Sequence, residues 1–296
     1  MKRFARVIIV LMLLITIAGC AAPSNAQIAA TTRPVYEFTD FLCRNTPLNV
    51  TLLVTEDVSC LHDYTLQVKQ MRAIEAAEVI VISGAGLEAF LEDVLPKGKK
   101  VIDASSQVDL LYFDEEEIHS HDHVQDHGHN HRVDPHIWLS ISNAILMADE
   151  IYLRLSEKYP EYKAAFSQNH AELTAMLQAL SQYALSELSC LSSRELITFH
   201  DGFAYFAHEN GLTILRAVEE EAGSEASALE LRELIQLVRL HDLPAIFTEI
   251  NGSTSAAQII AAETGVTSYP LDMAMGNRGY FDAMYHNIDR IKEALS

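Results

Sequence analysis

The sequence predicts an α/β fold of two lobes with parallel sheets, joined by one long helix. Short apolar runs alternate with helical patterns over residues 28–103, and the same rhythm returns over residues 196–295. Such alternation is typical of parallel sheets covered by helices. Residues 161–188 contain no glycine or proline and would form a helix about 40 Å long; two ordinary helices with an unmarked bend are the alternative. The 296 residues suit two domains of moderate size or one large one.

In the first half, the continuous apolar run at residues 79–82 indicates a central strand covered on both faces. The Ser-Gly-Ala-Gly turn after it lacks the spacing of a phosphate-binding loop. Val68, Met71 and Ile74 recur at three-residue steps, which predicts a helix. Further strands are expected at residues 28–30, 50–54 and 101–103, and further helices at 34–43 and 87–94.

In the second half, Ser227 and Glu230 form a capping-box signature that opens a helix through Leu240. Earlier, residues 140–159 have a helical pattern that Pro160 interrupts. Strands are expected at residues 196–199, 213–218, 245–249 and 266–269, with helices behind the first of these, at 258–264 and at 280–295.

The N-terminus has the features of an export signal. Three basic residues precede an apolar run at residues 7–17, which is too short to span a bilayer comfortably. Cys20 follows Ile-Ala-Gly and resembles the lipobox of bacterial lipoproteins, which implies cleavage before Cys20 and a diacylglycerol on its sulfur; a plain signal peptide is the alternative. We expect residues 1–19 as signal peptide, 20–27 as lipid anchor and tether, 28–142 as the N-terminal lobe, 143–189 as connecting helices and 190–296 as the C-terminal lobe.

Charge and cysteine content restrict the partners and the compartment. The formal net charge of -20 argues against nucleic acid and against an anionic membrane surface, and it fits a cationic ligand. Export means an oxidising compartment, where Cys43, Cys60 and Cys190 allow one disulfide. The pair Cys43–Cys60 is preferred and would contribute about 3 kcal/mol, although sequence alone does not establish its geometry.

A histidine-rich stretch at residues 119–131 is expected to be a mobile, solvated loop, because alternating His, Asp and Gly cannot bury a core. Neutral imidazole is a common ligand of borderline metals, so the loop is expected to gather metal weakly. A cloning tag is disfavoured because the run is interior and interrupted by other residues. Its histidines are His119, His121, His123, His127, His129 and His131.

Four further residues share one structural property, because each follows an apolar run or a stiff turn and begins a loop or helix. They are His62, His136, His200 and Asp272. Ligands of α/β sheets bind outside the carboxyl ends of the strands, and two of the four lie in each half. Three imidazoles and one carboxylate suit a tetrahedral zinc ion in a cleft between lobes. A single histidine such as His136 is more often a core residue, so only the whole set carries the prediction.

Residues from about 28 to 295 resemble the metal-binding receptors of bacterial ABC importers for zinc and manganese. The matching segments are Leu61-His62-Asp63-Tyr64, Asp134-Pro135-His136-Ile137-Trp138, Phe199-His200-Asp201-Gly202-Phe203-Ala204-Tyr205-Phe206, Leu271-Asp272-Met273-Ala274-Met275-Gly276, Gly279-Tyr280 and His286-Asn287-Ile288-Asp289.

The resemblance implies two α/β lobes on one long backbone helix, with His62, His136, His200 and Asp272 as ligands. A histidine at position 200, where manganese receptors usually carry a carboxylate, points to zinc, as does the histidine-rich loop. Glu249 is expected to orient an imidazole through its free N–H, with direct ligation as the alternative. Leu61 and its neighbouring cysteine depart from the family pattern.

The predicted function is an extracytoplasmic receptor, lipid-anchored to the cell membrane, that captures Zn²⁺ for an ABC importer permease. A monomer is expected. A zinc hydrolase is disfavoured because four protein ligands leave no position for water, and neither HExxH nor a nucleophile elbow is present. The sequence also fits a manganese or iron receptor of the same family, or a metal-dependent adhesin.

Overall fold

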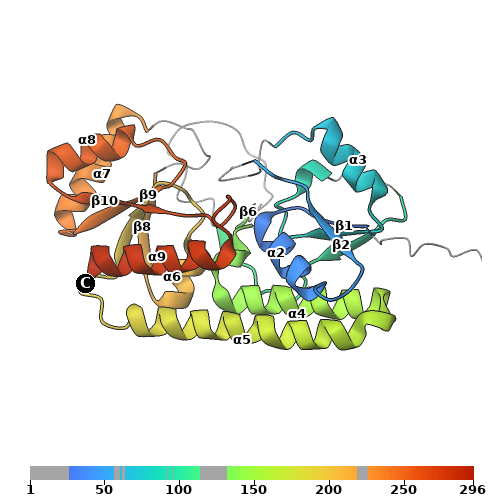
Figure 1. Cartoon of the computed structure of the whole chain (residues 1–296). Coiled ribbons are helices and arrows are strands. Elements are labelled where there is room, and N and C mark those ends of the chain that lie inside the picture. The colour runs from blue at the N-terminus through green and yellow to red at the C-terminus, as the bar shows by residue number, and fades with distance from the viewer. Residues whose placement is uncertain are drawn as a thin grey trace, which may run out of the picture.

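The computed structural model describes residues 27–56, 61, 64–91, 93–95, 97–113, 132–218 and 226–296. They form two lobes above a pair of long helices (Figure 1). The first sheet has the order β2-β1-β3-β4 and the second β10-β9-β7-β8, with parallel pairing throughout both. The strands are β1 (Gln27–Ala30), β2 (Asn49–Leu52), β3 (Val79–Ile82), β4 (Lys100–Asp103), β7 (Glu195–Thr198), β8 (Thr213–Ala217), β9 (Ala245–Glu249) and β10 (Thr267–Leu271).

The helices follow the strands in the alternation that the sequence predicts. They are α2 (Arg33–Leu42), α3 (Val68–Ala76), α4 (Ile141–Lys158), α5 (Lys163–Glu187), α6 (Ala204–Asn210), α7 (Ala228–Leu240), α8 (Ser255–Thr264) and α9 (Tyr280–Leu295). Short 3-10 turns occupy Ala89–Leu91, Ile137–Leu139 and Pro160–Tyr162, and a small antiparallel pair joins β5 (Tyr112–Phe113) to β6 (Arg132–Val133). No helix in the part of the chain described here is both long and apolar enough to cross a membrane.

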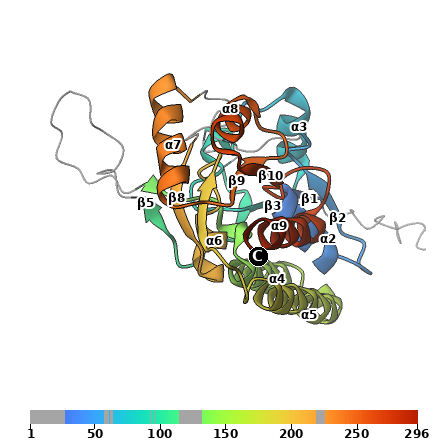
Figure 2. The same ribbon diagram turned by 90° about the vertical axis from the view of Figure 1, so that its left-hand side faces the viewer.

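The long helix α5 joins the lobes, as expected from residues 161–188. Its 25 residues extend for about 37 Å at 1.5 Å per residue, and the alternative of two bent helices is wrong. Pro160 ends the preceding helix, so α4 and α5 turn back on each other and lie side by side (Figure 2). In Figure 1, α4 lies beneath the first lobe and the longer α5 extends beneath both. The helix α5 also contacts α2 from the first lobe and α9 from the second.

One local expectation needs correction. The helix expected at residues 87–94 is only the 3-10 turn Ala89–Leu91, because Glu88 points inward and its carboxylate accepts bonds from the backbone N–H groups of Ser83 and Gly84. In α3, Val68 is 68% exposed and Ile74 is buried. The helix predicted from Val68, Met71 and Ile74 is confirmed, although residues at steps of three drift around a helix of 3.6 residues per turn and so do not share one buried face.

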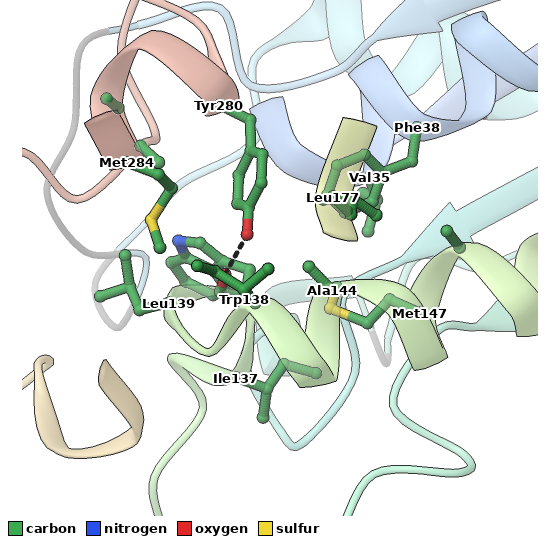
Figure 3. Close-up of a cluster of buried hydrophobic side chains, with 14 of the residues drawn as sticks. Val35, Phe38, Ile137, Trp138, Leu139, Ala144, Met147, Leu177, Tyr280 and Met284 are labelled. Atoms are coloured by element: carbon green, nitrogen blue, oxygen red, sulfur yellow. Dashed lines mark hydrogen bonds between the residues drawn. The ribbon is translucent and has the colours of Figure 1, made fainter. Parts of the chain in front are cut away.

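One apolar core runs from the first lobe through the long helices into the second. Trp138 lies at its centre and is fully buried, and the hydroxyl of Tyr280 donates to the Trp138 carbonyl oxygen at 3.0 Å (Figure 3). Phe38 of α2 packs edge-on against Tyr280 of α9, with 4.9 Å between ring centroids. The lobes are therefore packed against each other rather than tethered by a free linker.

Candidate metal centre

His136 is held by the turn that precedes the 3-10 helix Ile137–Leu139. The carboxylate Oδ1 of fully buried Asp134 accepts a hydrogen bond from the His136 backbone N–H at 2.9 Å and lies 2.8 Å from His136 Nδ1. A carboxylate beside Nδ1 favours the tautomer with its proton on that nitrogen, which leaves Nε2 with a lone pair. The turn thus supplies a buried, oriented imidazole with Nε2 available to a ligand.

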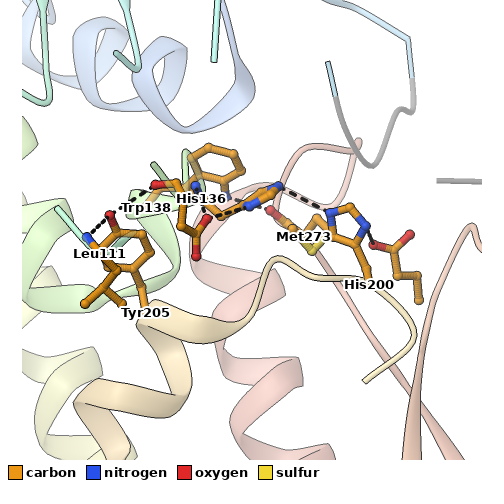
Figure 4. A network of polar contacts seen from close by, with 8 residues as sticks. Leu111, His136, Trp138, His200, Tyr205 and Met273 are labelled. Carbon is orange, nitrogen blue, oxygen red and sulfur yellow. Dashed lines mark hydrogen bonds and ion pairs between the residues drawn. The ribbon is translucent and has the colours of Figure 1, made fainter. Parts of the chain in front are cut away.

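Asp134 is itself fixed from the second lobe. The hydroxyl of Tyr205, in α6, donates to the Asp134 carbonyl oxygen at 3.1 Å and accepts from the Leu111 backbone N–H at 2.9 Å (Figure 4). Burial is the main cause that raises the pKa of Tyr205 to about 12, so its hydroxyl stays protonated and can donate near neutral pH. The sequence patterns did not indicate these roles of Asp134 and Tyr205, although both residues lie within the matching motifs.

His200 meets His136 at the centre of the site. Its Nε2 lies 3.2 Å from His136 Nε2, and the two rings are nearly perpendicular, with 5.0 Å between centroids. Zinc–nitrogen bonds of about 2.05 Å at a tetrahedral angle would separate two nitrogen ligands by about 3.3 Å. The observed spacing therefore suits two imidazoles that share one metal ion, and it also suits a direct N–H···N hydrogen bond.

The carboxyl ends of three adjacent strands supply the rest of the described site. Thr198 ends β7 two residues before His200, Glu249 ends β9, and Asp272 directly follows β10. Glu249 Oε1 lies 3.6 Å from His200 Nδ1, and both side chains are buried. Glu249 and Asp272 line one small cavity. The parallel order of the strands is what brings these distant positions to one edge.

Asp272 is set by a reciprocal pair of hydrogen bonds with Asn287 of α9. The Asp272 backbone N–H donates to Asn287 Oδ1 at 2.7 Å, and Asn287 Nδ2 donates to the Asp272 carbonyl oxygen at 2.7 Å. The carboxylate Oδ1 accepts from the Ala274 N–H at 2.9 Å, and Oδ2 accepts from Arg278 Nε at 3.0 Å. Asn287 is fully buried, so this pairing fixes where the chain turns after β10.

Gly202 leaves room for the His200 ring. A Cβ atom at position 202 would lie 2.6 Å from His200 Cδ2 and 2.6 Å from the terminal methyl carbon of Met273. Trp138 supports the other side, because its indole N–H donates to the Met273 carbonyl oxygen at 2.7 Å and its ring packs 5.5 Å from that of His136. The site is therefore closely packed below the two imidazoles.

The structure brings His136, His200 and Glu249 together and sets Asp272 on the cavity that Glu249 lines. The fourth expected ligand, His62, lies outside the described residues, as do the histidine-rich loop, Cys20 and Cys60. Among the described residues no group of three or more metal-ligating side chains is close enough to hold an ion.

Cys43 is buried in the core. Burial, with a smaller contribution from Asp40, raises the pKa of its thiol to about 12. Its pairing with Cys60 stays a prediction.

The comparisons of this chain with known proteins agree on one protein family. Residues 28–294 match the family model described as zinc-uptake complex component A, periplasmic (ZnuA). The zinc-binding lipoprotein AdcA of Streptococcus pneumoniae is 32% identical over 284 residues, which cover 92% of this chain and 56% of AdcA. The chain thus spans about half the length of this curated relative.

Two solved structures have the same architecture over nearly the whole chain. A crystal structure of ZnuA superposes with a TM-score of 0.79 at 28% identity and covers 92% of this chain and 100% of that one. The receptor FpvC of Pseudomonas aeruginosa, solved with Mn²⁺, gives a TM-score of 0.78 at 26% identity, with 92% and 99% covered. With this fold and the match over residues 28–294, the chain belongs to the zinc-uptake complex component A family of metal-binding receptors.

Proposed function

We propose that this protein captures Zn²⁺ outside the cytoplasm and delivers it to the permease of an ABC importer. The observation that carries the proposal is the 3.2 Å separation of the Nε2 atoms of His136 and His200, each with a carboxylate beside its Nδ1. Membership of the ZnuA family and similarity to a zinc-binding lipoprotein support it.

In this proposal the zinc ligands are Nε2 of His136, Nε2 of His200, the Asp272 carboxylate and His62. Asp134 and Glu249 hold the two described imidazoles by their Nδ1 sides, which fixes ring orientation and raises ligand basicity. Four protein ligands complete a tetrahedral zinc site and leave no position for an activated water. The expected activity is therefore binding and release rather than hydrolysis.

Manganese is the second candidate cargo, because FpvC was solved with Mn²⁺ on the same fold. Imidazole-rich sites bind zinc more tightly than manganese by the intrinsic affinity order of divalent metals. With His200 in the ligand set, we expect zinc to displace manganese at equal concentrations. A titration in which zinc, manganese and iron compete for the purified protein would also recognise an iron receptor. Growth of a deletion strain under zinc starvation would separate transport from metal-dependent adhesion.

The proposal includes the segments that the structure does not describe. Cys20 would carry the lipid that anchors a monomeric receptor to the outer face of the cell membrane, after removal of residues 1–19. The histidines between residues 119 and 131 would raise the local zinc supply near the ordered site, with weak affinity because they have no fixed geometry.

The direct test is elemental analysis of the exported chain purified without added metal. One zinc per chain is expected, and His200→Ala should lose it. His241→Ala is the matched control, since His241 also pairs with a carboxylate, Glu195, at 2.9 Å but on the surface. Full zinc content in the His200→Ala protein, or stoichiometric manganese in the unmodified protein, would overturn the assignment.

A further inference from the structure

Arg278 forms an ion pair with the proposed ligand Asp272. Its Nε donates to Asp272 Oδ2 at 3.0 Å, while the other carboxylate oxygen accepts from the Ala274 backbone N–H. The Asp272 side chain is 12% exposed and that of Arg278 is 43% exposed. Both oxygens of this carboxylate are therefore engaged by donors from the loop between β10 and α9.

The loop that carries Arg278 is anchored on the opposite lobe from both sides. Before it, Asn277 Oδ1 accepts from Arg33 Nη2 at 3.0 Å; after it, the Tyr280 backbone N–H donates to Glu37 Oε2 at 2.8 Å. Gly279 has φ +87°, and a Cβ there would lie 3.2 Å from Glu37 Oε1. The guanidinium thus extends from a segment whose two neighbours are fixed to α2, which makes its orientation toward Asp272 a property of the fold.

From this geometry we infer that Arg278 sets the zinc affinity of the receptor by competing with the metal for the Asp272 carboxylate. The inference rests on the proposed function, since it requires Asp272 to be a ligand. A metal that approaches Oδ2 must displace the Arg278 N–H or share the oxygen with it. The fixed positive charge beside the carboxylate also repels a divalent cation, so both effects weaken binding.

Competition of this kind suits a protein that has to release its cargo. When the metal leaves, the guanidinium can take back the carboxylate, which lowers the barrier to dissociation. The competing interpretation is an exposed ion pair with little energetic effect, the usual behaviour of surface pairs. Here one partner is nearly buried, and the pair lies at a proposed ligand, so the effect should appear in binding rather than in stability.

The test measures Zn²⁺ affinity by competition with a chelator at pH 7.5, and Zn²⁺ dissociation by stopped flow, for Arg278→Gln. We expect about tenfold tighter binding and slower dissociation, with a smaller gain at high salt. Arg290→Gln is the matched control, because Arg290 is also on the C-terminal segment, pairs with Glu293 at 2.7 Å and gives the same net charge. It should leave affinity unchanged.

A second pair of variants separates this inference from the proposed site. Asp272→Asn should bind zinc weakly, and adding Arg278→Gln to it should tighten binding less than in the wild-type protein, because competition for the carboxylate is lost and only repulsion between the guanidinium and the metal remains. Unchanged or weaker binding by Arg278→Gln, with Asp272→Asn still impaired, would refute competition by Arg278 and leave the ligand set standing. Wild-type affinity in Asp272→Asn would remove Asp272 from the ligand set and Arg278's role with it.

Discussion

Asp134 offers the sharpest test of how the site holds its imidazoles. Its Oδ1 serves two His136 donors, the backbone N–H and Nδ1, at 2.9 and 2.8 Å. Its Oδ2 is buried and has no hydrogen-bond partner among the residues described. Asp134→Asn keeps an oxygen for both His136 donors but removes the negative charge, whereas Asp134→Ala removes the acceptor as well. The two substitutions therefore separate charge from hydrogen bonding.

The expected losses of zinc affinity differ between the two substitutions. Loss of a carboxylate that supports a metal-ligating histidine typically costs about 10- to 100-fold in metal affinity. We place Asp134→Asn near the lower value, about 1.4 kcal/mol, and Asp134→Ala near the upper, about 2.7 kcal/mol. The asparagine amide would occupy the position of Oδ2, so its N–H groups would be buried without a partner at a cost of about 1–3 kcal/mol in folding free energy.

The assay is zinc titration against a chelator at pH 7.5, with thermal unfolding followed on the same samples to confirm a folded protein. Glu195→Gln serves as the control, because Glu195 pairs with His241 at 2.9 Å on the same β7 strand that leads to His200, yet at the surface. It should not change zinc affinity. Wild-type affinity in a folded Asp134→Ala protein would show that the Asp134–His136 contact does not support metal binding.

Three further outcomes are expected. Gly202→Ala should lower zinc affinity at least tenfold, because the new methyl would displace the His200 ring; a titration with unchanged affinity would contradict this. Zinc affinity should be lower at pH 5 than at pH 7.5, since imidazole must be neutral to bind and protonates near 6.5 in solution; equal affinities at both pH values would count against histidine ligands. Burial raises the pKa of Glu88 to about 7, so between pH 4.5 and 7 the folded state retains a proton that the unfolded chain releases. The free energy of unfolding should therefore fall by about 3 kcal/mol as pH rises through this window. Denaturant unfolding of Glu88→Gln should show a flatter pH dependence than wild type in that window; equal slopes would contradict the shift.

Much of the fold could be predicted because its pattern is local. The apolar run at residues 79–82 is β3, the capping box at Ser227 begins α7, and the absence of glycine and proline between residues 161 and 188 corresponds to α5. Prediction failed where side-chain contacts with the backbone override the local pattern. The segment after β3 does not form a regular helix because Glu88 caps backbone N–H groups instead, and nothing local to residues 87–94 indicates that contact.

The candidate site could be predicted only in part, for a similar reason. His200, Glu249 and Asp272 each follow or end a strand, so the rule that ligands bind at the carboxyl ends of strands identifies them. The supporting residues obey no such rule. Asn287 reaches Asp272 across 15 positions, and the two contact only because α9 packs against β10. Supporting contacts of this kind depend on packing, which the chain order does not reveal.

The packing between lobes limits how the proposed receptor can respond to a bound metal. Glu37 of α2 accepts from the first N–H of α9, and Trp138 hydrogen-bonds both to Tyr280 and to the Met273 carbonyl beside Asp272. Separating the lobes would break these bonds and expose a continuous apolar core, which is far more costly than moving a few side chains. Capture and release should therefore proceed through local rearrangement at the site. The proposed exchange of the Asp272 carboxylate between metal and Arg278 would be a rearrangement of that size, because it would require only the half-exposed guanidinium to move.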